Sequence, residues 1–523
     1  MKQLLLSIIC CLFLSFVHGQ GGTKLSITKL HFNSGLEKNL FEAVEKHQPY
    51  DPVQLFIIID SAITEKSIHD AVESVNGFAE QLKGEKPGKT FSKTVQNYFD
   101  ETHERFFTKY ELSAFFNQIF ESGTYNCVTA SALYAILFDK LGIQYAIKEK
   151  PTHVYLIVNP GMENIMVETT DPRGLISGVS DDLKKKYVKF LKAEKLISDK
   201  DLTSNSTDDL FYKSYYPDSN ISLVQLAGVQ YYNKGVTLMN NKDYAGALNA
   251  YEKSYRLYPS ERTAFLIISC LEQFLGDNFV TTYDQNKEYL VKYVNYTHME
   301  ETRQTLHDAF EKVARELLLN QNDKIHYDAF YSYLKENITD SAALSKITFT
   351  NFFYLGTAEG LKSNYAKSLT YLKQAAAINP NNLMLQSIVT VAVMQDLTTN
   401  DDLEGNEFLD SLIYYSKLFP FLLENNKVQT VFAAVYLQLA GENYNKNKGD
   451  AGGKYINSFE SFRKEYPDMD VKDDLIGWAY GEESSYYIRK GNKAKAKEVL
   501  ITGLKYSPDN QTLKTKLSYL KYF

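Results

Sequence analysis

The sequence predicts an α+β domain followed by an all-α array of helix pairs. Between residues 127 and 170, an apolar helical segment precedes two short runs rich in β-branched and aromatic residues, a pattern typical of a helix and a hairpin. From about residue 221 to the end, apolar residues recur at the three- and four-residue spacing of helices. The 523 residues are 44% hydrophobic and 23% charged, which favours folded domains over disorder or a membrane bundle.

Charge and motif content exclude several classes of function. Lys and Arg number 57 against 64 Asp and Glu, and this mildly acidic chain has no long basic block, so we expect no nucleic-acid partner. The sequence contains no HExxH, paired CxxC, P-loop or GxGxxG motif. We therefore expect neither a metal ion nor a nucleotide cofactor.

The first residues have the pattern of a signal peptide. Lys2 supplies a positive charge, and residues 4–17 form an apolar run broken only by two serines. Small residues then occupy the positions that a signal peptidase reads, with cleavage before Gln20. Because this run is too short to span a bilayer, a signal peptide at 1–19 is favoured over the alternative of an uncleaved anchor. The expected mature protein is secreted or periplasmic and has no transmembrane segment.

The remaining chain divides into three predicted parts. Residues 20–199 form the α+β domain, with a mostly helical first half, a helix from Cys127 to Leu141, and strands at 153–158 and 165–170. Residues 200–220 are rich in Asn, Ser, Thr and Asp and are predicted to be a linker. Residues 221–523 form the helical array.

Two cysteines remain after signal removal, and their surroundings differ. Cys270 lies in an apolar helical run, so we expect a buried small hydrophobe. Cys127 begins a helix that Thr124 or Asn126 could cap, and a helix N-terminus favours a thiolate. Cys127 is therefore the candidate nucleophile.

An imidazole and a carboxylate follow Cys127 at a useful spacing. A thiolate nucleophile needs an imidazole as base and acid, and the imidazole needs an acceptor that orients it. His153 opens the first strand, while Glu168 and Asp171 lie on or just after the second. A helix followed by an antiparallel hairpin can bring these side chains together.

The combined pattern resembles the core of the transglutaminase-like superfamily. The resemblance rests on Gly123-x-x-x-Cys127-x-x-x-Ser131-Ala-Leu-Tyr, on Pro-Thr-His153-Val-Tyr and on Val167-Glu-Thr-Thr170, and covers roughly residues 95–175. It implies a papain-like fold with Cys127 as nucleophile and His153 as base and acid. The family's Asp stands about 15 residues after the His, so the resemblance favours Glu168 as the third member. Asp171, in an Asp-Pro context closer to the family's local motif, is the alternative.

One departure from the family concerns the oxyanion. Many members place an aromatic donor, often Trp, well before the Cys, whereas the only Trp here is Trp478 in the helical array. The backbone N–H of Cys127 would be one oxyanion donor. The second donor is left open, with Gln118 and Tyr125 as candidates.

Three segments of the helical array superimpose. The first carries Gly235, Tyr244, Ala247, Tyr251 and Pro259 at offsets 0, 9, 12, 16 and 24; the second carries Gly356, Tyr365, Ser368, Leu372, Ala375 and Pro380 at 0, 9, 12, 16, 19 and 24; the third carries Ser484, Ala496, Leu500, Gly503 and Pro508 at 0, 12, 16, 19 and 24. Small residues let paired helices approach, large ones fill the gap, and Pro ends the second helix. This pattern resembles the tetratricopeptide repeat. Stretches 260–350 and 385–470 lack it and are predicted to be irregular helix pairs.

Two functions follow from these observations. The first is an exported cysteine-dependent amide hydrolase or acyl transferase of transglutaminase-like type, whose repeats bind a peptide or protein. The alternative is a non-catalytic binding or scaffold protein with a degenerate transglutaminase-like domain. The sequence also holds five N-x-S/T tripeptides, which matter only if the host glycosylates exported proteins; they begin at Asn205, Asn220, Asn295, Asn337 and Asn510.

Overall fold

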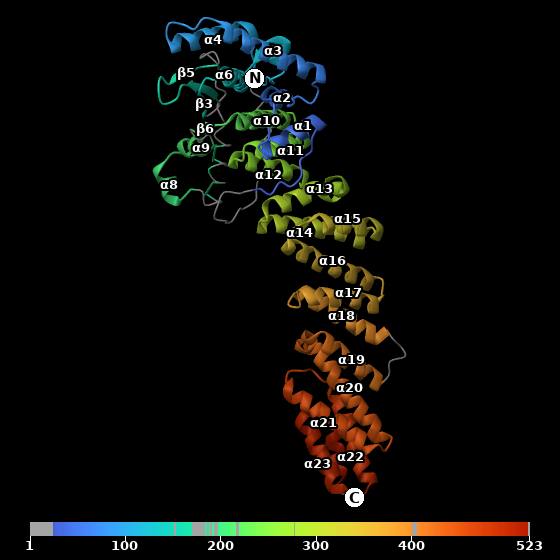
Figure 1. Ribbon diagram of the computed structural model, residues 1–523. Helices are drawn as coiled ribbons and strands as arrows, with labels where there is room; N and C mark the ends of the chain where they lie inside the picture. The colour runs from blue at the N-terminus through green and yellow to red at the C-terminus, as the bar shows by residue number, and fades with distance from the viewer. Residues whose placement is uncertain are drawn as a thin grey trace. The chain divides into compact units, whose positions relative to one another are not determined.

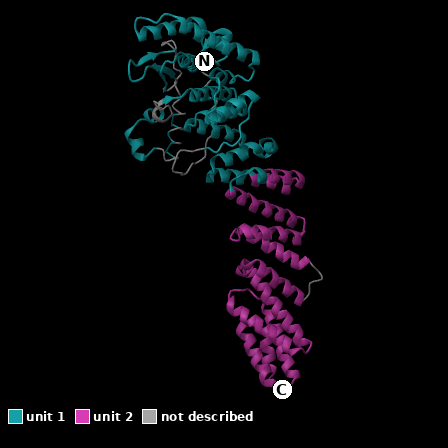
Figure 2. Cartoon of the chain, viewed as in Figure 1, with its two compact units in different colours: residues 1–309, 334–340 teal, residues 310–333, 341–523 magenta. Residues whose placement is uncertain are grey.

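The computed structural model describes residues 25–150, 153–169, 184–185, 188, 191–192, 197–215, 219–276, 278–399 and 405–520 (Figure 1). The predicted signal peptide and Asp171 lie outside these residues. The described chain is mostly helical and carries two small sheets. Its compact units are residues 1–309 with 334–340, and residues 310–333 with 341–523 (Figure 2).

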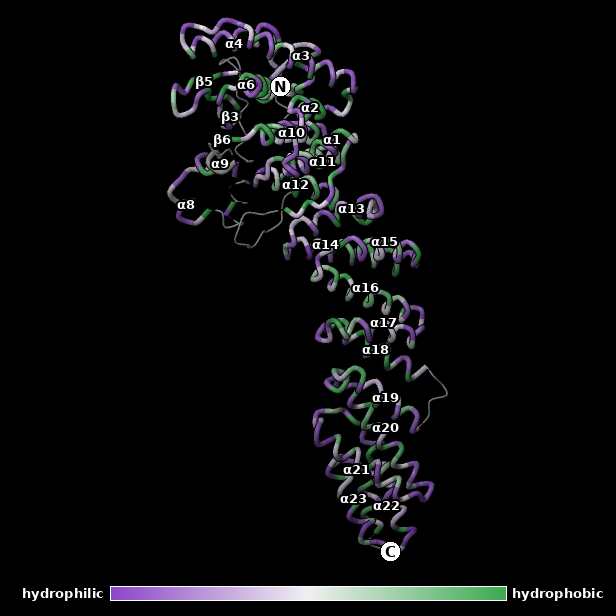
Figure 3. The backbone as a smooth tube through the Cα atoms, in the orientation of Figure 1, coloured by the Kyte–Doolittle hydropathy of each residue, from purple (hydrophilic) through white to green (hydrophobic). Residues whose placement is uncertain are grey.

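Helices dominate the first half of unit 1. They are α1 (Gly35–Glu45), α2 (Pro52–Ile57), α3 (Glu65–Gly84), α4 (Phe91–Phe106), α5 (Gln118–Ser122) and α6 (Cys127–Leu141). Helix α6 is rich in hydrophobic residues along its length (Figure 3) and is buried from Val128 to Phe138, so it forms the centre of the core. It ends at Gly142, which adopts the left-handed conformation that favours glycine (φ 69°).

Two sheets accompany these helices. Strand β1 (Lys109–Tyr110) pairs in parallel with β2 (Thr124–Tyr125). The larger sheet has the order β5-β4-β3-β6 and is antiparallel throughout, with β3 (Tyr145–Lys150), β4 (His153–Val158), β5 (Ile165–Val167) and β6 (Ser219–Ile221). The two predicted strands correspond to β4 and to a shorter β5, and α6 packs on β4.

The segment predicted as a linker is structured where it is described. It holds α8 (Asp199–Ser204), α9 (Thr207–Tyr215) and β6, which pairs with β3 as an edge strand. Polar side chains therefore mark helix caps here, as at Ser198, whose hydroxyl accepts from the Asp201 N–H.

Unit 1 extends beyond the predicted boundary at residue 221. It includes α10 (Leu223–Asn240), α11 (Tyr244–Leu257), α12 (Glu261–Phe274) and α13 (Phe279–Thr297), while α14 (Glu300–Ala314) and α15 (Lys324–Asn337) are divided between the units. The reason is burial, because Leu226 and Tyr231 of α10 belong to the same core as α6. Buried ion pairs also join the parts, between Lys253 and Glu37 (2.7 Å) and between Arg262 and Glu149.

Helix pairs continue through unit 2, and the predicted all-α array is confirmed. After a π-helical turn (Arg315–Asn320) come α16 (Ser341–Leu361), α17 (Tyr365–Ile378), α18 (Leu383–Thr399), α19 (Asn406–Leu418), the 3-10 helix η2 (Pro420–Glu424), α20 (Asn426–Asn445), α21 (Gly449–Glu465), α22 (Asp473–Arg489), α23 (Lys493–Tyr506) and α24 (Gln511–Tyr519). At the predicted positions, small residues let the paired helices approach closely. A Cβ at Gly356 would lie 2.7 Å from Leu372, and the Ser484 hydroxyl donates to the Ala496 carbonyl (3.2 Å).

One regular pair lies inside a stretch predicted to be irregular. Helices α20 and α21 carry Ala440, Gly449, Gly452 and Ile456 at offsets 0, 9, 12 and 16. Their proline is Pro467, at offset 27 instead of 24, because α21 has 17 residues whereas α11, α17 and α23 have 14 each. Because α21 is longer, its proline does not fall at the repeat's offset of 24, and the sequence pattern was therefore not recognised.

Candidate functional site

The N-terminus of α6 is firmly capped. The Asn126 side chain accepts from the N–H groups of Val128 (3.0 Å) and Thr129 (2.9 Å), and the Thr129 hydroxyl accepts from the Asn126 N–H (2.9 Å). This reciprocal capping box makes Asn126 the cap, whereas Thr124 belongs to β2. Cys127 is the first helical residue, where the N–H groups of the helix end favour negative charge.

Four donors surround the Cys127 sulfur. The backbone N–H groups of Val154, Val128 and Cys127 and the hydroxyl of Tyr110 all favour its anionic form. Burial opposes them and is the larger effect, so the pKa of the Cys127 thiol lies above its ordinary value. The residue still has partial solvent exposure.

His153 and Glu168 form a close pair. The Nε2 atom of His153 lies 2.8 Å from Oε1 and 2.9 Å from Oε2 of the Glu168 carboxylate. His153 opens β4 and Glu168 directly follows β5, so the antiparallel pairing of these strands brings the side chains together. The imidazole also stacks on Tyr155, with ring centroids 5.9 Å apart. The side chains are 30% and 34% exposed, so both reach solvent.

The backbone places the thiol beside this pair. Val154, whose N–H donates to the Cys127 sulfur, is the residue after His153. Within residues 25–150 and 153–169, no hydrogen bond joins the sulfur to the imidazole. Because Nε2 is held by Glu168, Nδ1 is the ring nitrogen left for a thiol.

The candidate oxyanion donors have other contacts. The Oε1 atom of Gln118 accepts from the Phe115 N–H (2.8 Å), which holds the turn before α5. The Tyr125 ring is buried against Phe107, with centroids 4.6 Å apart. Neither contact involves Cys127. Tyr110 does contact the sulfur, and the sequence analysis missed it because a two-residue strand has no readable periodicity.

Cys270 matches its predicted role. It is fully buried in α12, and burial raises its pKa to about 12. Of the two described cysteines, Cys127 is partly exposed, whereas Cys270 is buried.

Unit 2 contains a separate groove between α18 and α20. It encloses about 640 Å³ and is lined by Leu383, Gln386, Ser387, Thr390, Val391, Phe421, Glu424, Asn425, Asn426 and Lys427. Helix α18 carries apolar side chains on two faces: Leu385, Val389 and Val393 are buried, whereas Leu383 and Val391 are 79% and 58% exposed. Exposed apolar side chains on a helix whose other face is already packed are typical of a binding surface.

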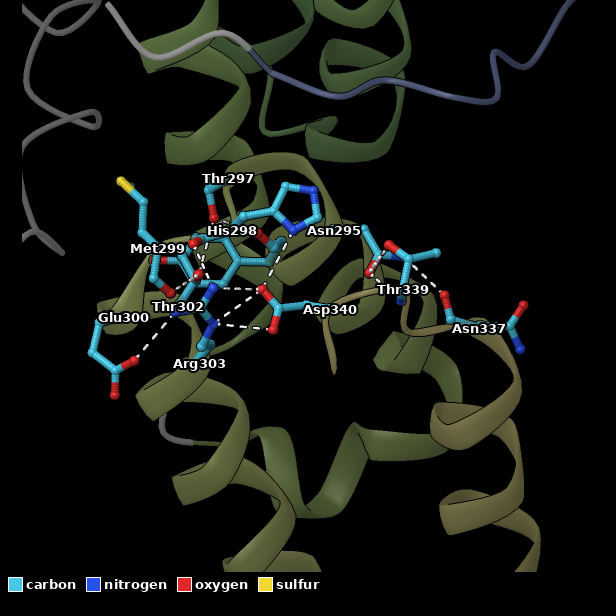
Figure 4. Close-up of polar contacts among 11 residues, drawn as sticks. Asn295, Thr297, His298, Met299, Glu300, Thr302, Arg303, Asn337, Thr339 and Asp340 are labelled. Atoms are coloured by element: carbon cyan, nitrogen blue, oxygen red, sulfur yellow. Dashed lines mark hydrogen bonds and ion pairs between the residues drawn. The ribbon is translucent and has the colours of Figure 1, made fainter. Parts of the chain in front are cut away.

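Two of the five asparagines that begin N-x-S/T tripeptides form hydrogen bonds that join separate segments of the chain. The Asn295 amide nitrogen donates to the Asn337 carbonyl (2.8 Å), and its oxygen accepts from the N–H (2.9 Å) and hydroxyl of Thr339 (Figure 4). In the same view the Arg303 guanidinium forms a bidentate pair with the buried Asp340. Asn510 caps α24, and its amide donates to the Asp473 carbonyl (2.6 Å).

Two other kinds of feature are absent from the described ranges. No three or more His, Cys, Asp or Glu side chains there are grouped to hold a metal ion. In the same part of the chain, no helix combines the length and apolar character needed to cross a membrane.

Comparison with known proteins identifies one repeat. The tetratricopeptide repeat family model matches residues 230–261, which include the first predicted segment from Gly235 to Pro259. The prediction of a tetratricopeptide-type repeat is confirmed there, and such repeats typically bind peptides or proteins. No curated protein matches the chain.

Proposed function

We propose that this protein is an exported cysteine-dependent amide hydrolase or acyl transferase of transglutaminase-like type, with helical repeats that bind a peptide or protein partner. The observation that carries the proposal is the His153–Glu168 pair, whose Nε2 and Oε1 atoms lie 2.8 Å apart. The residue after His153 on β4 is Val154, whose N–H donates to the Cys127 sulfur. In this proposal Cys127 is the nucleophile, His153 the base and Glu168 the acid that orients the imidazole.

The proposed reaction has two steps. His153 takes the thiol proton, and the Cys127 sulfur attacks an amide carbonyl carbon to form the S–C bond. The C–N bond then breaks, and His153 returns the proton to the departing amine. In the second step water or another amine attacks the thioester carbon while His153 accepts its proton. The C–S bond then breaks, and His153 returns the proton to the sulfur. Glu168 keeps the imidazole oriented throughout.

A second candidate is a non-catalytic binding protein. It is favoured by the raised pKa of the Cys127 thiol and by the missing hydrogen bond between that sulfur and the His153 ring. In this case the repeats alone would carry the function, and the tetratricopeptide match supports that part equally well.

The rate of iodoacetamide labelling at Cys127, mapped by peptide mass and followed from pH 4 to 9, separates the two candidates. We expect labelling below neutral pH in the wild type, because an imidazolium stabilises the thiolate. H153A and E168Q should lose this low-pH labelling. H69A, at an exposed position on α3, is the matched control and should behave as wild type. An ordinary thiol profile, unchanged by H153A, would reject the enzyme and leave the binding protein.

A further inference from the structure

The residues just before Cys127 form strand β2, and strand β1, which contains Tyr110, pairs with it. Strand β1 pairs with β2 so that Tyr110 lies opposite Tyr125, and the Glu111 N–H donates to the Tyr125 carbonyl (2.9 Å). Gly123 allows this approach, because it has φ 68° and a Cβ there would lie 2.3 Å from the Thr108 hydroxyl oxygen. Tyr110 is thereby set beside the residues that lead into α6.

Asn126, the residue that caps α6, also holds the loop that follows Tyr110. The Asn126 amide group donates to the carbonyls of Leu112 and Ala114, at 3.0 Å each. The loop after Tyr110 is therefore tied to the same residue that caps α6. The Tyr110 ring also meets Tyr125 edge to face, with centroids 5.6 Å apart. Its side chain is restrained before any substrate arrives.

We propose that Tyr110 is a further catalytic residue, whose hydroxyl donates a hydrogen bond to the Cys127 sulfur and stabilises the thiolate. This inference rests on the proposed function. The strand register places Tyr110 opposite Tyr125, two residues before Cys127, and the Tyr110 hydroxyl is one of the donors to the sulfur. Tyr110 itself is half-buried. A charge-assisted hydrogen bond in a partly dry site is stronger than one in water, so it offsets part of the cost of burying the sulfur's charge.

The direction of the hydrogen bond follows from the surroundings. Burial raises the pKa of Tyr110 well above its ordinary value, and the neighbouring sulfur raises it further. The phenol is therefore protonated at physiological pH and acts as a donor. It cannot replace His153 as the base, so the two residues have separate roles.

The test compares Y110F with the wild type through the pH dependence of iodoacetamide labelling at Cys127. Loss of one hydrogen bond to an anion should move the labelling midpoint upward by about one pH unit. The plateau rate at high pH should stay unchanged, because the fully formed thiolate is equally exposed. Y145F, whose hydroxyl binds Asp139 instead, is the matched control. An unchanged midpoint in Y110F overturns the inference, and so does a higher plateau without a shift, which would indicate altered access.

A second variant and a second measurement protect the test from misfolding. N126S retains a capping oxygen but loses the amide that binds the loop after Tyr110, so it should shift the midpoint in the same direction. Thiolate absorbance at 240 nm, with C127S subtracted, reports the ionisation without a reagent. If H153A leaves the midpoint unchanged but Y110F raises it, the proposed function fails and with it the catalytic role of Tyr110, and only the hydrogen bond from Tyr110 to the thiolate stands. If H153A raises the midpoint but Y110F leaves it unchanged, the inference about Tyr110 is rejected and the proposed function stands.

Discussion

At the scale of single residues, chemistry depends on what surrounds each side chain. Cys127 and Cys270 both lie in apolar helices, and burial raises the pKa of both thiols. They differ because Cys127 is the first residue of its helix, where backbone N–H groups donate to the sulfur, whereas Cys270 lies in mid-helix. This difference follows from the sequence, since the Asn cap and the start of the apolar run are both readable.

Glu483 gives a pH-dependent prediction in unit 2. It is 7% exposed in α22 and accepts from the Tyr444 hydroxyl (2.9 Å), and burial raises its pKa to about 7 from 4.5. The folded state therefore binds the proton more tightly than the unfolded state. Its contribution to stability is present below about pH 4.5 and is lost as the pH rises to about 7.

The variant E483Q should remove this dependence, because the amide keeps an acceptor for Tyr444 without a charge. Between pH 4 and pH 8, the difference in unfolding free energy between wild type and variant should change by on the order of 3 kcal/mol in favour of the variant. Urea unfolding followed by fluorescence of Trp478, which lies on the same helix, measures it. E407Q, exposed on α19, is the control. A pH-independent difference for E483Q would contradict the assignment.

At the scale of elements, small residues and prolines set the helix pairs. Helices α11, α17 and α23 each end two residues before a proline, and the residue between adopts nearly the same non-helical conformation, with φ from −142° to −139° and ψ from 80° to 82°. A proline disfavours helical conformation in the residue before it, so the chain turns at a fixed place. These breaks between helices were predictable from the sequence.

Strand β3 was not predictable, because its charged residues hide the alternation of apolar and polar residues. The burial of Glu149 depends on Arg262, more than a hundred residues away.

The groove between α18 and α20 yields a prediction about binding. Because Leu383 and Val391 expose apolar side chains along it, we expect a phage-displayed random peptide library to select peptides with apolar side chains. V391E should reduce binding of the selected peptides at least about tenfold, since a buried charge opposes apolar contact. I501E, on α23 outside the groove, should bind as wild type. Equal affinity for V391E and wild type would show that partners bind elsewhere.

At the scale of the whole molecule, the first repeat helices belong to the N-terminal unit. Helix α10 buries Leu226 and Tyr231 in the core around α6, and the Tyr231 hydroxyl donates to Glu37 (2.7 Å). Lys253 is 1% exposed and pairs with the same carboxylate. A cut at residue 221 would leave this lysine buried without its partner, which is strongly unfavourable.

A fragment of residues 221–523 should therefore be partly unfolded. We expect hydrogen exchange to be fast in α10 and α11 of the fragment, at least about tenfold faster than in the full chain, while α20 to α23 keep their protection. Exchange followed by mass spectrometry measures both regions in one sample, so the second serves as the internal control. Full protection of α10 in the fragment would instead support a boundary at 221. Partner binding is best compared in full-length variants.

The sequence by itself determined the helix pairs and the order of Cys127, His153 and Glu168, because caps, apolar periodicity and proline breaks are local properties of the chain. It also determined that Cys270 is a buried side chain. Only the tertiary structure decided that Tyr110 contacts the sulfur, that Val154 donates to it, and that α10 completes the first core. These contacts join short segments without periodicity, or residues far apart in sequence, and their energy comes from burial that no local pattern records.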